Sequence, residues 1–329
     1  MSIRFKDQFE IACTSADTTV IQRAPPTGMS CFFLKPSTVV RALREPYAAP
    51  VVAAYLGMFR RLRGWFDNTE AGALGRKASN ARAFLLLTLL TWVPAWAHQY
   101  DPEDYPHLAE RMFDLLCNGL RSAADMEEAA VALPGFPPQP DSERESQETF
   151  LIAATALINE QGYHGASVDK ISARLNVTKG SFYHHHEAKD DLVQLCFRRT
   201  FEVMNHAQRA ANTLAVDGWT RLYAVCRALL DFQLSERGPL LRTTALSALP
   251  EGLVGNTIAD FDRIATRFAM QINDGIIDGS LRAVDVRVAA HMVAMMINSA
   301  AEVSLWVKGG SAEDIAVIYL RPMLFGLLG

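Results

Sequence analysis

This sequence of 329 residues has few cysteines, no signal-peptide pattern and no long uninterrupted apolar run. The cysteines are odd in number and scattered without a CxxC pair, which argues against a disulfide framework or a zinc site. The most apolar run, residues 83–97, is interrupted by Pro94 and is short for a membrane span, so it favours a buried core helix. The N-terminus lacks the basic start, apolar run and small-residue cleavage site of a secreted protein. We therefore expect a cytoplasmic protein without a membrane partner.

The chain also lacks the common signatures of catalysis. It has no nucleophile elbow, phosphate-binding loop, dinucleotide fingerprint or His/Cys/Asp set at metal-ligand spacing, which argues against an enzyme and predicts no cofactor. The run from His184 to His186 does not predict a metal site, because adjacent side chains on a helix point about 100° apart. Half of the residues are hydrophobic and the formal charge is −4, so the chain is globular and not broadly basic.

Residues 148–193 have the pattern of a three-helix head. An apolar helix is predicted to end at Gly162, and Ser167 is placed to cap a short second helix. Asn176 and Val177 then form a tight turn, after which Thr178 can cap another short helix. Two short helices joined by such a turn are typical of a helix-turn-helix.

The spacing and residue types of this segment resemble the N-terminal head of the TetR family of bacterial transcriptional regulators. The resemblance rests on an ordered set of positions: Phe150, Gly162, Tyr163, Ser167, Val168, Ile171, Val177, Lys179, Gly180, Ser181, Tyr183, His184, Lys189 and Leu192. It implies base contacts from Lys179, Gly180 and Ser181. It further implies contacts to the sugar-phosphate backbone from Thr178, Tyr183, His184 and Lys189. Ser167 and Lys170 are additional phosphate candidates, since they begin the preceding helix.

The charge of the head leaves a second interpretation open. Residues 141–195 hold five basic and nine acidic residues, whereas nucleic-acid binders usually carry a basic patch. The acidic residues lie mainly before the first helix and after the last, which leaves residues 170–185 without acids. DNA binding is the favoured interpretation, and a head that only packs as three helices is the alternative.

A repeat at an offset of about 210 residues links the two ends of the chain. Residues 83–96 form an apolar segment that ends at Trp96, and residues 288–306 form one that ends at Trp306. Each is followed after five residues by a capping motif, at Asp101 or at Ser311, and then by a last helix. Two such helices resemble the final pair of a TetR-type ligand domain, which in that family forms the dimer interface. The chain resembles a tandem fusion that lacks its first head.

We therefore predict an all-α fold with a helix-turn-helix head, two helical-bundle domains of the ligand and dimerisation type, and a short N-terminal β-hairpin. An unstructured leader is the alternative to the hairpin, which rests on alternating residues near the start. The predicted segments are a leader at 1–29, a TetR C-terminal-like helical domain at 30–122, a Pro-rich linker at 123–141, the head at 142–195 and a second ligand-type domain at 196–329.

An apolar cavity between helices of the second ligand-type domain would need aromatic and Met side chains with a few polar groups. The candidates are Trp219, Tyr223, Phe261, Met270, His291, Met295 and Asn298. Plain core packing is the alternative for each of them. His291 and Asn298 are seven residues apart and share one helix face, so they are the best polar candidates.

These features predict a DNA-binding transcriptional regulator, a repressor that is released by a small, mostly apolar effector. A small-molecule sensor or adaptor that does not bind DNA, built on the same helices, is the alternative. The expected partners are double-stranded DNA, an effector of unknown identity and a second copy of the chain. We also expect the two ligand-type domains to pair within one chain as a pseudo-twofold unit.

Overall fold

The computed structural model describes residues 48–67, 75–97, 99–122, 131–138, 145–176, 189–249, 251–307 and 311–327. Within these ranges the chain is helical, and the only β-type pairing is one bridge between Arg121 and Leu281. The all-α prediction is therefore confirmed. The predicted hairpin within residues 1–29 lies outside the described residues.

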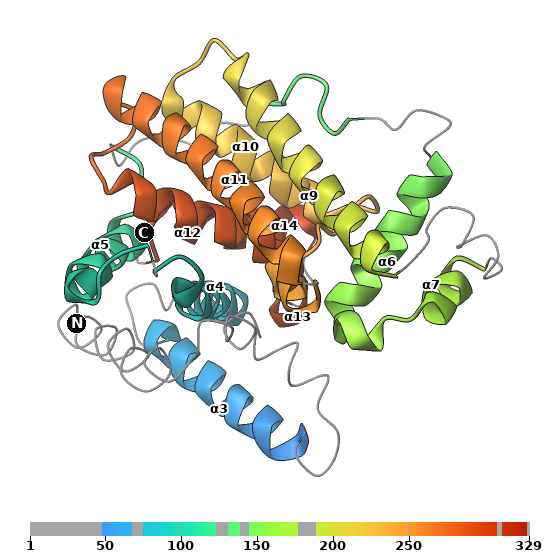
Figure 1. Ribbon diagram of the computed structural model, residues 1–329. Coiled ribbons are helices and arrows are strands. Elements are labelled where there is room, and N and C mark those ends of the chain that lie inside the picture. The colour runs from blue at the N-terminus through green and yellow to red at the C-terminus, as the bar shows by residue number, and fades with distance from the viewer. Residues whose placement is uncertain are drawn as a thin grey trace.

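The described helices lie between residues 48 and 325, with short 3-10 turns between some of them (Figure 1). Their bounds are α3 Ala48–Asp67, α4 Gly75–Ala97, η3 Pro102–Asp104, α5 Tyr105–Asn118, α6 Glu145–Gly165, α7 Val168–Leu175, α9 Lys189–Asn212, α10 Gly218–Leu234, η4 Thr243–Ala248, α11 Glu251–Ile277, α12 Val286–Ser299, η5 Ala300–Glu302, α13 Val303–Trp306 and α14 Ala312–Phe325. Helices α6 and α7 lie to one side of the body formed by the others (Figure 1).

The apolar run at 83–97 lies in α4, which is a core helix as predicted. Its side chains from Ala81 to Leu89 are all buried. Helix α4 packs against α12, α13 and α14, and α5 packs against α12 and α14. The cavity between these elements, lined by residues such as Leu85, Leu116 and Met292, measures only about 10 Å³. The two helix pairs of the sequence repeat are therefore close-packed against each other within one chain.

Aromatic stacking and side-chain hydrogen bonds hold the two pairs together. Trp306 stacks on Phe59 with 3.8 Å between ring centroids, and its carbonyl accepts a 2.9 Å hydrogen bond from the Asn80 side chain. Trp96 stacks on His291 with 5.0 Å between centroids and 4° between planes. These contacts join α3 and α4 to α12 and α13, which are far apart in sequence.

The ends of α5 and α14 interlock through two glycines at equivalent positions of the repeat. The Leu120 N–H donates to the Leu324 carbonyl at 2.8 Å, and the Leu327 N–H donates to the Leu116 carbonyl at 2.6 Å. Gly119 (φ 65°, ψ −155°) and Gly326 (φ 99°, ψ 153°) adopt conformations that are almost restricted to glycine. A Cβ on Gly119 would lie 2.4 Å from the Leu324 oxygen, so the backbones could not approach with a side chain there.

The long apolar helix predicted over residues 288–306 is interrupted in the structure. It becomes α12, the 3-10 turn η5 and α13. The Ile297 carbonyl accepts a hydrogen bond from the Gln233 side chain and another from the Ala300 N–H, which tightens the chain there into a 3-10 turn. By length and composition this segment could cross a membrane, but 83 % of it is buried inside the protein, as in a core helix.

We predict that Gly119→Ala lowers the free energy of unfolding by about 3 kcal/mol or more, because a strained backbone and a steric clash add together. Gly279→Ala is the matched control, since Gly279 has φ 81° but a Cβ at this position would meet nothing within 4 Å. The control should cost only about 1 kcal/mol, the backbone contribution alone. Urea unfolding of both variants measures the difference, and equal losses would contradict the interlock.

Candidate nucleic-acid interface

Helix α6 forms the base of the head and buries the predicted apolar face. The buried residues are Phe150, Leu151, Ala154, Leu157 and Ile158. Helix α6 packs against α7, against η4 and against α9, which follows the head in sequence. The regular helix ends where predicted, because Gly162 takes φ 72° and ψ 170° and one further turn follows it. This break turns the chain toward α7.

Helix α7 begins with the predicted cap. The Ser167 Oγ accepts a hydrogen bond of 3.2 Å from the Lys170 backbone N–H, and Ile171 is fully buried against α6. The helix ends at Asn176, whose φ of 55° is left-handed and starts the expected turn. The first half of the predicted helix-turn-helix is therefore confirmed in its caps and in its packing.

The residues expected to touch DNA are only partly within the described chain. The positions outside it are Thr178, Lys179, Gly180, Ser181, Tyr183 and His184. Lys189 is the first residue of α9. The Lys170 ammonium lies on the surface, where it donates to Gln161 Oε1 at 2.6 Å and to the Gly165 carbonyl at 2.8 Å. The contacts of Lys170, Ser167 and Lys189 with DNA phosphates stay predictions.

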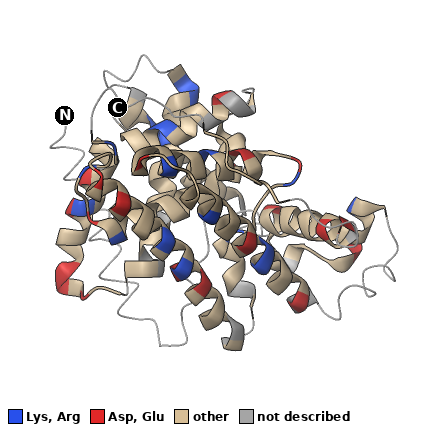
Figure 2. Ribbon diagram, turned by 90° about the horizontal axis from the view of Figure 1, so that it is seen from above, with Lys and Arg blue, Asp and Glu red and all other residues tan. Residues whose placement is uncertain are grey.

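One basic residue of α7 is held in an ion pair. The Arg174 guanidinium binds both oxygens of Glu160 at 3.0 and 3.2 Å, which commits the second basic residue of α7. Basic and acidic residues are interspersed along the helices of the body (Figure 2). Binding to the DNA backbone would therefore depend on the head itself, as the sequence composition predicts.

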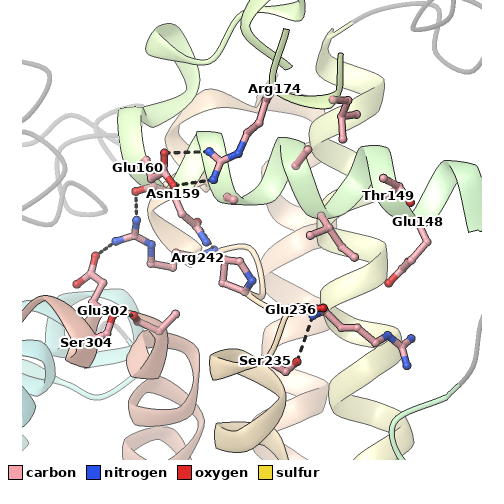
Figure 3. Close-up of a pocket in the computed structure, with 18 of the residues that line it drawn as sticks. Glu148, Thr149, Asn159, Glu160, Arg174, Ser235, Glu236, Arg242, Glu302 and Ser304 are labelled. Atoms are coloured by element: carbon pink, nitrogen blue, oxygen red, sulfur yellow. Dashed lines mark hydrogen bonds and ion pairs between the residues drawn. The ribbon is translucent and has the colours of Figure 1, made fainter. Parts of the chain in front are cut away.

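A buried polar network joins the head to the body. The Asn159 side chain, on α6, donates to the Leu240 carbonyl at 2.9 Å and accepts from the Arg242 N–H at 3.1 Å. The Arg242 guanidinium in turn hydrogen-bonds the Asn159 carbonyl and pairs with Glu302 (Figure 3). Both members of the ion pair are buried. Helix α6 is thus linked through one arginine to η5, at the end of α12.

Arg199 makes a second link between head and body. This buried residue of α9 binds Glu148 of α6 at 2.8 Å and the Pro239 carbonyl at 3.3 Å. Sequence reasoning missed both arginines, because their partners lie 40 to 83 residues away along the chain. One sequence feature could have indicated a buried ion pair: a lone charged residue within an apolar run, as at Glu302 and at Arg242.

The residues predicted to line a ligand cavity in the body serve as packing elements where their contacts are described. Trp219 meets Phe325 edge-on at 5.0 Å, and Phe261 meets Phe201 edge-on at 4.8 Å. The Asn298 amide is bonded to the backbone of Leu241 and Thr243. The structure has a cavity of about 950 Å³ beside α6 and the small cavity of about 10 Å³ between the helix pairs. None of the seven candidates lines either of them.

The remaining candidates also lie apart from those cavities. Tyr223 and Met295 are buried, and His291 is the residue stacked on Trp96. Met270 is 62 % exposed on the surface of α11. An effector role for these side chains stays a prediction.

The large cavity lies at the junction of head and body and has a volume of about 950 Å³. Its walls come from α6, α7, the segment from 235 to 242 and the segment from 301 to 305 (Figure 3). Arg242 and Glu302 lie in its wall, so the cavity adjoins the polar network that links the two parts.

We predict that Glu302→Leu destabilises the protein by about 3–5 kcal/mol, because it leaves the Arg242 guanidinium buried without its countercharge. The double variant Arg242→Met/Glu302→Leu should be more stable than Glu302→Leu alone, since it removes both charges. Asp260→Ala, which removes an exposed partner of Arg263, is the control and should cost less than about 1 kcal/mol. The interpretation would be contradicted if the double variant lost as much stability as Arg242→Met and Glu302→Leu together.

Comparison with known proteins agrees with the geometry of the head. Residues 150–196 match the family model described as bacterial regulatory proteins, tetR family. The Transposon Tn10 TetC protein of Escherichia coli is 29% identical over 103 residues, which are 31% of this chain and 52% of the relative. The HTH-type transcriptional activator FasR of Mycolicibacterium smegmatis is 33% identical over 93 residues, which are 28% of this chain and 42% of the relative. The chain thus spans about half the length of the curated relatives it matches.

Among solved structures, the TetR family transcriptional regulator PfmR from Thermus thermophilus is 26% identical, with a TM-score of 0.44. That comparison covers 54% of this chain and 98% of PfmR. AibR in complex with isovaleryl coenzyme A and operator DNA is 21% identical, with the same TM-score, and the comparison covers 55% and 98%. The family assignment follows from the sequence match across the head, together with its caps and buried face. The head of this chain, residues 150–196, is that of a TetR-family bacterial regulator.

Proposed function

We propose that this chain is a cytoplasmic transcriptional regulator that binds double-stranded DNA through residues 178–184 and acts as a repressor. The observation that carries the proposal is the family match over 150–196 combined with the cap geometry of α7. The Ser167 cap, the buried Ile171 and the left-handed Asn176 are what a helix-turn-helix requires before its recognition helix.

Within the head we assign two kinds of contact. Lys179, Gly180 and Ser181 read base edges, and Thr178, Tyr183, His184 and Lys189 contact the sugar-phosphate backbone. Ser167 and Lys170 add backbone contacts at the start of α7, where the helix N-terminus favours phosphate. The Lys170 ammonium is exposed at this corner and can exchange its bonds to Gln161 and Gly165 for a phosphate oxygen.

Release from DNA follows binding of a small, mostly apolar effector. The proposal is supported by the network that joins α6 to the body through Asn159, Arg242 and Glu302. A ligand that favours one position of the segment 235–242 also shifts the population of head orientations, because that segment holds α6 directly.

We further propose that α3–α5 form an internal counterpart of α11–α14, as the sequence repeat indicates. The packing of α4 and α5 on α12 and α14 supports this assignment. Such a chain carries one head for its two helix pairs, whereas a palindromic operator presents two half-sites about 34 Å apart. A second chain then joins through another face to engage both half-sites.

The second candidate function is a small-molecule sensor or adaptor without DNA binding. The acidic balance of residues 141–195 and the pairing of Arg174 with Glu160 favour it. Loss of the phosphate-neutralising charge would leave the same helices and the same junction with the body. The two candidates differ in one observable, which is the affinity for duplex DNA.

We predict that Lys179→Ala costs about 1–3 kcal/mol of binding to a site found by footprinting, and relaxes specificity at the base it contacts. Lys189→Ala should weaken binding to every sequence. It should also reduce the slope of log affinity against log salt concentration by about one. Arg76→Ala, at the exposed start of α4, is the control and should leave both quantities unchanged. Unchanged affinity in both head variants would favour the sensor.

A further inference from the structure

We propose that the cavity between head and body binds an amphipathic organic cation, a positively charged group carried on an apolar body. The proposal deepens the proposed function and rests on it in one respect, since it identifies this cation as the effector. The volume of about 950 Å³ is within the usual range for small-molecule sites.

Apolar side chains line both walls of the cavity. The head contributes Ile152, Ala156 and Leu175, and the body contributes Pro239 and Leu305. Leu305 is 44 % exposed, so part of its apolar side chain meets water in the cavity. An aromatic or aliphatic ligand body in the cavity would remove this apolar surface from water, which favours binding.

The charges of the walls favour a cation over an anion. Five glutamates line the cavity, and three arginines do so. Arg174 is bound by Glu160 and Arg242 by Glu302. The Arg237 guanidinium donates to the Pro138 carbonyl at 2.6 Å and lies over the Phe232 ring. Each guanidinium group therefore has at least one partner in the protein. Arg237 Nη1 has no hydrogen-bond partner within the described residues, but it is buried away from solvent.

Two carboxylates remain for a ligand. Glu145 begins α6 on the head wall, and Glu236 follows α10 on the body wall. Within the described residues neither of them forms an ion pair, and both are exposed. Glu148, by contrast, is neutralised by Arg199. A cation in the cavity could therefore approach a carboxylate outside any ion pair on each wall, with an apolar surface between them.

A ligand in this place would contact the head and the body at once. The head wall belongs to α6 and α7, and the body wall includes Glu302 of η5 and Ser304 and Leu305 of α13. Helix α13 packs against α4, so this wall is also in contact with the N-terminal helices. Any difference in affinity between two head orientations would shift their populations, which is the requirement for an effector.

The test uses tetraphenylphosphonium and tetraphenylborate, two ions of nearly the same shape and opposite charge. Isothermal titration calorimetry on the full chain should show binding of the cation and no saturable binding of the anion. Glu145→Gln/Glu236→Gln should weaken the binding of the cation by about tenfold, since it removes two countercharges near a partly solvated site. Leu305→Ser should weaken it as well, through lost apolar contact.

Glu103→Gln is the matched control, because Glu103 is an exposed glutamate of η3 that does not line the cavity. It should leave the affinity unchanged, and thermal melts of all variants should coincide with that of the parent chain. Equal affinity for the two ions, no binding of the cation, or a Glu145→Gln/Glu236→Gln variant that binds like the parent would overturn the proposal.

A second measurement separates this proposal from the proposed function. Fluorescence anisotropy first gives the affinity for duplex DNA without any ion, which tests the regulator alone. Tetraphenylphosphonium should then weaken DNA binding in the parent chain and not in Glu145→Gln/Glu236→Gln. If DNA binds and the cation does not alter its affinity, the effector assignment fails while the regulator stands. If the chain binds the cation with the expected dependence on variants and does not bind DNA, the regulator fails while the site stands.

Discussion

The reciprocal backbone contact between the ends of α5 and α14 is the constraint on which the arrangement of this molecule depends. Two glycines make it, because only residues without a Cβ allow the Leu116–Leu120 and Leu324–Leu327 segments to come within hydrogen-bonding distance of each other. Arg82 and Arg282 reinforce it by donating to the carbonyls of Leu327 and Gly119, each at 2.7 Å. An apolar helix face that would otherwise need a second chain is thereby covered from within.

This internal cover has consequences for the head. Helix α4 packs on α13, α13 follows η5, and Glu302 of η5 holds the Arg242 guanidinium that binds α6. The N-terminal helices are therefore connected to the head through a continuous set of packed and hydrogen-bonded groups. This contiguous set identifies the residues at which coupling between the N-terminal helices and the head can be measured.

The sequence predicted the local features of the fold well, because their causes lie within a few residues. The break of α6 at Gly162, the Ser167 cap and the capping box at Ser311 each follow from one side chain or from its absence. The repeat also indicated which helices would present equivalent faces. Asp101, by contrast, stands at the predicted helix start without a side-chain capping hydrogen bond.

The features that the sequence did not predict depend on distant partners. The 3-10 turn at η5 arises where Gln233 bonds the Ile297 carbonyl, a contact that spans 64 residues. The junction cavity is assembled from three separated segments, so no local spacing marks it. Core packing and ligand cavities use the same aromatic and Met side chains, so the sequence alone does not distinguish these two roles in the body.

The most direct test of the central claim is whether the paired helices belong to one chain. Arg287 hydrogen-bonds Gln99 across the pair, so Gln99→Cys/Arg287→Cys places two thiols near each other for a short bis-maleimide. The product is identified by mass spectrometry of the peptides that carry both positions, and its size is read on a denaturing gel. The account predicts a cross-linked species at the mass of a single chain, 36.3 kDa. A cross-link between these positions found only in a covalent dimer would contradict it.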